Sequence, residues 1–144
     1  MKTAGELISR KKQQDVYTIA PEATVLDALR LMADKNVGAL PVLKDNELVG
    51  IVSERDYARK MVLKGRSSYA TPVSDIMTAA VVIVLPQQSL DECMALMTER
   101  HLRHLPVIGR GRLIGLLSIG DLVKEMVAEQ AETILHLEQY IRGE

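Results

Sequence analysis

The chain has 144 residues, and its 18 basic and 19 acidic side chains give a formal net charge of −1 at pH 7. This balance provides no basic surface of the kind that binds nucleic acid, and without Trp or Phe the chain has few rings on which bases could stack. The longest apolar run, 79–85, is far shorter than the roughly 20 residues of a membrane-spanning helix. We therefore expect neither a nucleic-acid partner nor a membrane anchor.

The N-terminal residues 1–6 lack the apolar stretch of a secretory signal peptide. The single cysteine, Cys93, excludes an intramolecular disulfide and suits a reducing compartment. Because Cys93 falls among apolar residues on one face of a predicted helix, we interpret it as core packing and not as a nucleophile. These features predict a cytoplasmic protein.

The first half of the chain alternates between segments of helical and of strand periodicity. Thr24 precedes apolar residues at i, i+3, i+4 and i+7 spacing, which predicts a helix capped at its N-terminus. Two apolar runs flank the polar residues 44–47, which predicts an antiparallel hairpin. The predicted elements are a helix over 4–12, a strand over 16–19, a helix from Thr24 to about Asn36, strands over 40–43 and 48–52, and a helix over 54–64.

Residues 65–72, rich in Gly, Ser and Pro, are predicted to form a linker, and residues 74–78 a short helical turn. The same pattern then returns as a strand over 81–84, a helix over 89–100, strands over 105–108 and 113–117, and a helix that starts at Ile119. An apolar stripe on that last helix continues beyond the pattern, which predicts cover by a partner subunit. The stripe comprises Leu122, Met126, Ile134, Leu137 and Ile141.

The two parts of the chain are copies of one unit, since they align without gaps at an offset of 65 residues. The run Leu40-Pro41-Val42 aligns with Leu105-Pro106-Val107, for example. A unit of about 50 residues buries too little surface to be stable alone, so we expect the copies to pack face to face about a pseudo-twofold axis. The expected divisions are a lead-in over 1–15, a first repeat over 16–64, a linker over 65–80, a second repeat over 81–127 and a helical extension over 128–144.

One stretch near the end of each repeat, 50–56 and 115–121, combines an apolar strand with a serine and, three residues later, an aspartate. Serine hydroxyls and free N–H groups at the start of a helix attract anions, and a carboxylate accepts hydrogen bonds from vicinal sugar hydroxyls. The pattern therefore indicates a site for a phosphorylated ribose. The alternative is a capping box without a ligand, in which serine and aspartate satisfy backbone N–H groups. The presence of two copies in matched surroundings favours the ligand site.

Three features of each repeat together resemble a tandem CBS-domain pair, also called a Bateman module. They are the order strand, helix, strand, strand, helix, the hydrophobic-Pro-Val run in the second strand, and Gly-x-x-Ser-x-x-Asp at the last junction. The resemblance covers residues 16–127 and implies an α+β fold in which two β-α-β-β-α repeats pack with pseudo-twofold symmetry. The chain is similar to the stand-alone bacterial pairs, because it carries no sign of an attached catalytic, channel or transporter domain.

The resemblance further implies adenine-nucleotide binding in two clefts between the repeats. In each cleft, a serine and a ribose-binding aspartate would come from one repeat and strand residues from the other. The first cleft would use Ser118 and Asp121 with Thr18, Ile19, Ala20, Gly38, Ala39 and Leu40. The second would use Ser53, Arg55 and Asp56 with Val82, Ile83, Val84, Arg103, His104 and Leu105.

The two implied clefts differ in charge. Arg55 and Arg103 are expected to reach phosphates in the second cleft, whereas the matching positions of the first are Gly120 and Gly38. Glycines there leave room for a larger ligand. We therefore expect AMP at one cleft and a dinucleotide such as NAD(H) at the other, with ATP, ADP and S-adenosylmethionine as further candidates. Which cleft takes which ligand stays open.

Three other features of the sequence could suggest a dinucleotide-binding loop, a metal site or a catalytic site, but each has a simpler explanation. The glycines within 109–112 precede a predicted strand, whereas a dinucleotide-binding loop precedes a helix, so we predict a hairpin turn. His101 and His104 have neither a cysteine nor a third histidine close in sequence, so we expect no metal site. No serine or cysteine has an evident activating base, so we expect no catalysis.

We therefore expect a regulatory, non-enzymatic sensor of adenine nucleotides that signals to an unidentified partner protein. It is expected to be a homodimer in which two repeat pairs form a flat disc. The alternative is a scaffolding protein whose clefts are vestigial and whose final helix docks on another protein.

Overall fold

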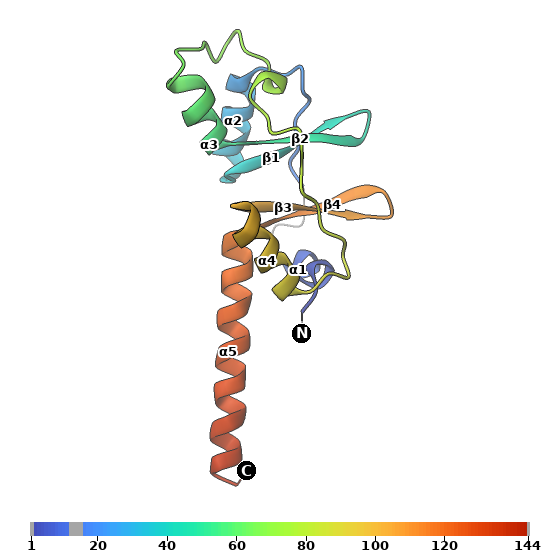
Figure 1. Cartoon of the computed structure of the whole chain (residues 1–144), viewed down its shortest axis with the longest axis vertical. Coiled ribbons are helices and arrows are strands. Elements are labelled where there is room, and N and C mark those ends of the chain that lie inside the picture. Colours follow the sequence, from blue (N-terminus) through green and yellow to red (C-terminus); the bar gives the residue numbers. More distant parts are fainter. Residues whose placement is uncertain (1, 12–15, 144) are drawn as a thin grey trace.

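The computed structural model describes residues 2–11 and 16–143. Within them the chain forms two small α+β halves, one stacked on the other, and a long helix extends away from the second half (Figure 1). Each half is built around one antiparallel hairpin, which we use to define it: β1–β2 in the first half and β3–β4 in the second. The two hairpins lie next to each other at the centre, where β2 contacts β4, and the helices lie on the outer sides.

The regular elements follow the duplicated order predicted from the sequence. The strands are β1 (Ala39–Lys44), β2 (Glu47–Ser53), β3 (His104–Gly109) and β4 (Arg112–Ser118). The helices are α1 (Ala4–Arg10), α2 (Val25–Lys35), α3 (Glu54–Tyr57), α4 (Leu90–Arg100) and α5 (Ile119–Ile141), with a π-helical segment at Ala58–Val62 and a 3-10 turn at Val73–Asp75.

The two hairpins have the same register, which makes the repeat visible in three dimensions. Val42 pairs with Gly50 in the first hairpin and Val107 with Gly115 in the second, and each hairpin has a bulge immediately after that valine. Both hairpins close with two residues of positive φ, as in a type I′ turn. In the second hairpin these are Arg110 (φ 53°) and Gly111 (φ 76°), which confirms that the glycine-rich run 109–112 is a turn.

The strands predicted over 16–19 and 81–84 are wrong as regular strands. Each contributes a single parallel bridge, Ile19 to Val42 and Val84 to Val107. Proline follows two residues later in both copies, at 21 and 86, and it cannot donate a ladder hydrogen bond, so the chain turns away from the sheet.

Several predicted helix boundaries also shift. The N-terminal helix ends at Arg10, and residue 12 of its predicted range lies outside the described residues. The helix predicted over 54–64 is a short α-helix that continues as the π-helical segment and ends at Val62. The turn predicted over 74–78 begins one residue earlier and spans Val73–Asp75. Only the N-terminal shift bears on the site, because it leaves Lys11 just beyond α1.

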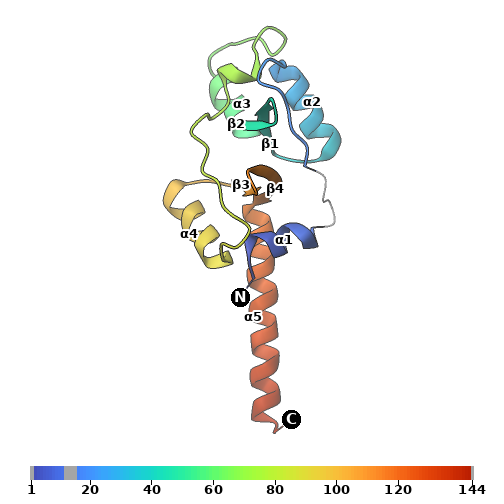
Figure 2. The same ribbon diagram turned by 90° about the vertical axis from the view of Figure 1, so that its right-hand side faces the viewer.

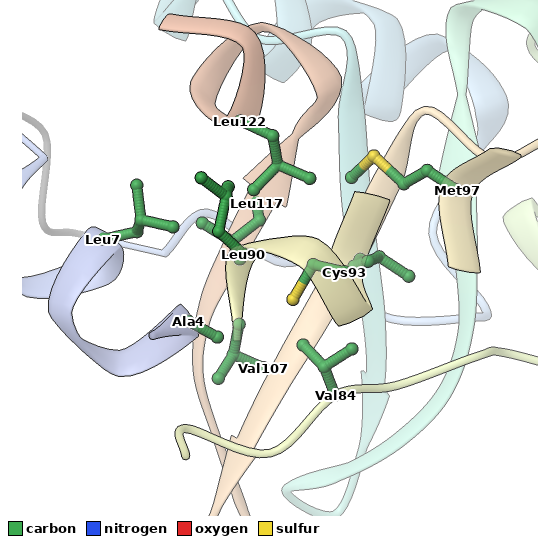
Figure 3. Packing of buried hydrophobic residues seen from close by; sticks show 10 residues of the cluster. Ala4, Leu7, Val84, Leu90, Cys93, Met97, Val107, Leu117 and Leu122 are labelled. Atoms are coloured by element: carbon green, nitrogen blue, oxygen red, sulfur yellow. The ribbon is translucent and has the colours of Figure 1, made fainter. Parts of the chain in front are cut away.

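Each half has its own hydrophobic core. In the first half, α2 packs on the hairpin and contributes Val25, Ala28 and Met32 to the core. In the second half, Leu90, Cys93 and Met97 of α4 meet Leu117 of β4 and Leu122 of α5 (Figure 3). The buried position of Cys93 confirms its interpretation as core packing.

Helix α1 belongs to the second core although it begins the chain. Ala4 and Leu7 lie among the second-half residues, as Figure 3 shows, and α1 contacts β4. The backbone N–H groups of Ala4 and Gly5 donate to the carbonyls of Gln88 (2.8 Å) and Pro86 (2.8 Å). Helix α1 therefore lies with the second half and α2 with the first, and the chain returns to the second half through the linker before α4 (Figure 2).

Within residues 2–11 and 16–143, no helix is long and apolar enough to cross a membrane. Even the 23-residue α5 carries charged side chains along its length.

The packing of α1 on β4 generates a test of the fold. A methyl group added at Gly115 would overlap the side chain of Ile8, so we expect Gly115→Ala to lower the free energy of unfolding by about 1–3 kcal/mol. Denaturant unfolding measures this. Gly120→Ala is the control, because its added methyl lies 3.6 Å from the nearest heavy atom, in a helix where Ala is favoured. Equal stability of the Gly115→Ala variant and the wild type would contradict the described packing.

Candidate functional site

The two Gly-x-x-Ser-x-x-Asp stretches form matching strand-to-helix junctions, and both are complete capping boxes. At the first junction the backbone N–H of Ser53 donates to Asp56 Oδ2 (2.9 Å), and that of Asp56 donates to Ser53 Oγ (3.2 Å). At the second, the N–H of Ser118 donates to Asp121 Oδ2 (2.8 Å), and that of Asp121 to Ser118 Oγ (3.1 Å). The capping reading of the sequence is therefore correct for both serines and both aspartates.

Capping does not remove these residues from the clefts, because both pairs also line a cavity. The Asp121 cleft has a volume of about 290 Å³, and its wall includes Ser118 and Asp121 from the second half and Gly38 and Ala39 from the first. The Asp56 cleft has a volume of about 320 Å³. Each cavity is large enough to admit part of a small ligand while the rest faces solvent.

The Asp56 cleft also draws on both halves. Its first-half wall comprises Gly38, Ile51, Ser53, Glu54, Arg55 and Asp56, and its second-half wall comprises His101, Leu102, Arg103 and His104, with Thr78 from the segment between the halves. In both clefts a serine and an aspartate from one half thus face residues at the start of the first hairpin strand of the other half.

Not every residue that the resemblance implied lies on a cleft wall. The Asp121 cleft includes Gly38, Ala39, Ser118 and Asp121, and the Asp56 cleft includes Ser53, Arg55, Asp56, Arg103 and His104. The walls do not include Thr18, Ile19, Ala20 and Leu40 of the first set, or Val82, Ile83, Val84 and Leu105 of the second. Leu40, Val84 and Leu105 are fully buried in the two cores, so their side chains serve packing.

Lys11 is a cleft residue that sequence reasoning missed. It follows α1, and its Nζ lies 2.9 Å from Asp121 Oδ2 and 2.9 Å from the carbonyl oxygen of Leu116. No signal in the repeat pointed to it, because Lys11 precedes the duplicated unit. Its position depends on α1 packing against the second half.

The helix ends that precede the hairpins supply a second pair of cleft residues, neither of which was among the predicted site residues. Asn36 ends α2 and His101 ends α4, both in the left-handed conformation (φ 54° and 56°). Asn36 lines the Asp121 cleft and His101 lines the Asp56 cleft. The two residues are equivalent under the 65-residue offset, so the repeat alignment contained the signal that would have found them.

Asp121 is held in its charged form. Burial raises the pKa of its carboxyl group, but the hydrogen bond from the Ser118 backbone N–H and the hydrogen bond and charge of Lys11 lower it more, so the pKa lies below its ordinary value. At the other junction, Asp56 Oδ1 forms an ion pair with Lys60 Nζ at 3.2 Å. An ionised carboxylate is an acceptor only, which suits the recognition of sugar hydroxyls.

His104 and Gly38 line both clefts and therefore form a wall that the clefts share. A Cβ built on Gly38 would lie 3.2 Å from Glu54 Oε1 and 3.9 Å from His104 Nε2, so the three residues stand close together. Burial is the main cause that lowers the pKa of His104. The positive charges of Lys11 and Arg103 lower this pKa further, whereas the negative charge of Asp121 raises it. The imidazole is consequently neutral at pH 7.

The clefts differ in their fixed positive charge. Arg55 and Arg103 line the Asp56 cleft, whereas Lys11 is the cation on the described wall of the Asp121 cleft. Among the residues that the structure describes, no group of three or more His, Cys, Asp or Glu is arranged to hold a metal ion. The carboxylates and cations on the two walls suit contacts with hydroxyl and anionic groups.

Comparison with known proteins adds the family context. A family model described as "CBS domain" matches residues 4–63 and 73–128. The chain is 46% identical over 125 residues to CBS domain-containing protein CBSX3, mitochondrial, of Arabidopsis thaliana. The matched region covers 83% of this chain and 61% of the plant protein, so the chain spans less than two thirds of that relative.

Solved structures of other proteins share this fold over nearly their whole length. A signal-transduction protein with CBS domains from Burkholderia ambifaria is 53% identical, with a TM-score of 0.86 over 90% of this chain and 96% of that one. A crystal structure of CBSX2 in complex with AMP is 32% identical, with a TM-score of 0.73 over 90% of this chain and 99% of that one.

The environment of His104 generates a prediction about pH. Because its pKa is lower in the folded chain than in the unfolded chain, the unfolded state binds more protons as the pH falls below about 6.5, and stability decreases. We expect His104→Gln to lose less stability than the wild type between pH 7.5 and pH 5.5, as measured by thermal melts.

His136→Gln is the matched control, because His136 is exposed on α5. The pH window lies above the ordinary range of aspartate, so titration of Asp121 does not contribute. A His104→Gln variant with the same pH dependence as the wild type would exclude His104 as a buried neutral group.

Proposed function

The chain belongs to the CBS-domain family, and we propose that it is a regulatory module that binds an adenine nucleotide in each of its two clefts and signals to a partner protein. The observation that carries this proposal is the position of the Ser53–Asp56 and Ser118–Asp121 pairs. Each pair caps its helix and at the same time lines a cavity between the halves.

The proposed contacts follow from the chemistry of each cleft wall. The carboxylates of Asp56 and Asp121 would accept hydrogen bonds from the two vicinal hydroxyls of a ribose. In the Asp56 cleft, Arg55 and Arg103 offer planar guanidinium groups to phosphate oxygens. In the Asp121 cleft, the Lys11 ammonium is placed to exchange its contact with Asp121 for one with a ligand phosphate. A nucleoside monophosphate carries both the ribose hydroxyls and the phosphate that the residues of each cleft can bind.

AMP is the nucleotide that we propose first, because a relative of the same fold, CBSX2, has been crystallised with it. NAD(H) is a further candidate for the Asp121 cleft, which has the lower fixed positive charge. Gly120 occupies the position that matches Arg55, and a glycine leaves more room for a larger ligand.

A ligand in either cleft would touch both halves of the chain, and this supports a regulatory role. Such a ligand favours the arrangement of the halves in which both of its contacts form. The shared wall of His104 and Gly38 would let occupancy of one cleft alter the other. We propose that the resulting change is read by a separate protein and that the module itself catalyses no reaction.

The aspartates provide the most specific test. In titration calorimetry with AMP, we expect the wild type to bind two equivalents per chain, and Asp121→Ala and Asp56→Ala to bind one each. Loss of a charged hydrogen-bond partner is worth about 1.5–3 kcal/mol, which corresponds to roughly a tenfold or greater loss of affinity at the altered cleft.

Asp91→Ala is the matched control, because Asp91 is an exposed aspartate in the first turn of α4. Thermal melts verify that each variant is folded, since removal of either cleft aspartate also removes half of a capping box. Unchanged stoichiometry in both cleft variants would show that the aspartates are not the ribose sites.

A ligand screen separates the sensor from the scaffolding alternative. A nucleotide present at 100 times its dissociation constant adds about 2.7 kcal/mol to the stability of the folded chain. We expect such stabilisation in thermal melts with AMP, and we would compare ADP, ATP, NAD+, NADH and S-adenosylmethionine. The absence of a shift with all six would favour a scaffold with vestigial clefts.

A further inference from the structure

We propose that Lys11 is a specificity-determining residue of the Asp121 cleft, which makes that cleft select phosphorylated nucleosides over nucleosides. The ammonium group of Lys11 is paired with Asp121, and a ligand phosphate is the anion that can replace this carboxylate as its partner. This inference rests on the proposed function and deepens it, because it names the residue that distinguishes a nucleotide from a nucleoside.

The ammonium group of Lys11 already contacts the carboxylate that a ribose would need. Its Nζ donates to Asp121 Oδ2 (2.9 Å) and to the carbonyl oxygen of Leu116 (2.9 Å). Asp121 Oδ2 also accepts from the backbone N–H of Ser118 (2.8 Å). Sugar hydroxyls that approach this oxygen therefore compete with an ammonium and an amide that both donate to it.

The Lys11–Asp121 pair is partly withdrawn from solvent. The side chain of Lys11 is 30% exposed and that of Asp121 is 26% exposed. Opposite charges attract each other more strongly where water is partly excluded, and an ion that loses its partner there is not fully compensated by solvent. A ligand that separates the pair without offering a new anion therefore binds at a disadvantage.

Lys60 at the other junction supports its aspartate in a different way. Its Nζ lies 3.2 Å from Asp56 Oδ1 and donates to the carbonyl oxygen of Ile76 (2.8 Å). The oxygen that accepts from the backbone N–H of Ser53 is the other one, Asp56 Oδ2. Lys60 is not among the described residues that line the Asp56 cleft, whereas Lys11 lines the Asp121 cleft. The competition with a ribose is therefore specific to the Asp121 cleft.

The second repeat does not carry the cations of the first junction. Under the 65-residue offset, Gly120 stands at the position of Arg55, and Glu125 stands at the position of Lys60. The second junction therefore has no basic residue at either position and has one more acidic residue. A cation that binds a phosphate there has to come from outside the duplicated unit.

The end of α1 supplies this positive charge. Arg10 forms an ion pair with Glu125 (3.6 Å), and the next residue, Lys11, pairs with Asp121. The backbone N–H of Lys11 donates to the carbonyl oxygen of Ile8 (3.3 Å), which fixes the start of the side chain. Its flexible four-carbon stem still lets the ammonium group move between neighbouring partners on the cleft wall.

A nucleotide and a nucleoside meet this arrangement differently. When AMP binds, its ribose takes Asp121 and its phosphate becomes the new partner of the Lys11 ammonium, so both charges stay compensated. Adenosine offers hydroxyl groups alone. It has to share Asp121 with Lys11 or leave the ammonium without an anion. The cleft is therefore expected to bind AMP more tightly than adenosine, and Lys11 is expected to be the cause.

Titration calorimetry in the Asp56→Ala background measures the Asp121 cleft alone. We expect this chain to bind one equivalent of AMP, and Lys11→Met to lower the ratio of the AMP affinity to the adenosine affinity at least tenfold. AMP loses a charged partner, while adenosine no longer competes with an ammonium group for Asp121. The chain with both clefts intact gives a second reading, in which the ratio changes for one of the two equivalents.

Arg10→Met is the matched control. It removes the same charge from the preceding residue, whose ion pair is with Glu125 and which is not among the described residues of the cleft wall. We expect this variant to keep the ratio of its parent, and thermal melts verify that both variants are folded. An equal fall of the ratio in Arg10→Met would assign the effect to the packing of α1 and overturn the role of Lys11.

The outcomes separate this inference from the proposed function. If the Asp56→Ala chain binds one equivalent of AMP and Lys11→Met leaves the ratio within about twofold of its parent, the nucleotide site stands and the role of Lys11 is overturned. If the Asp56→Ala chain is folded but binds no AMP, the proposed function fails for this cleft, and the inference fails with it.

Discussion

The reciprocal hydrogen bonding of a serine with an aspartate three residues later, repeated at the two strand-to-helix junctions, is the constraint on which the rest of the structure depends. It starts α3 and α5 at fixed points and holds each carboxylate at the edge of a hairpin. Because the two hairpins meet at the centre of the molecule, both carboxylates are placed on cavities between the halves. The capping interaction and the proposed binding site therefore share the same serine and aspartate side chains.

Much of the fold could be predicted from the sequence because the chain contains two copies of one unit. The 65-residue offset gave the order of the elements, the hairpins and the Ser–Asp junctions. Periodicity alone could not show that residues 16–19 and 81–84 form only a single bridge each, because an apolar run does not reveal how much of the backbone pairs. The position of Cys93 was predictable, since its apolar neighbours lie on one face of α4.

The parts that could not be predicted from the repeat are those that depend on tertiary packing. Lys11 precedes the duplicated unit, and only the packing of Ala4 and Leu7 in the second core places its ammonium beside Asp121. The shared wall formed by Gly38 and His104 likewise depends on how the halves meet. The asymmetry of the two clefts therefore has one part that the sequence shows, Arg55 against Gly120, and one part that arises only from tertiary packing, the position of Lys11.

The most direct test of the central claim is a crystal structure of the full chain grown with AMP. The account predicts a nucleotide in a cleft between the halves, with its ribose hydroxyls about 2.6–3.2 Å from the carboxylate oxygens of Asp56 or Asp121. A nucleotide bound elsewhere, or bound in a cleft without a contact to either carboxylate, would contradict it.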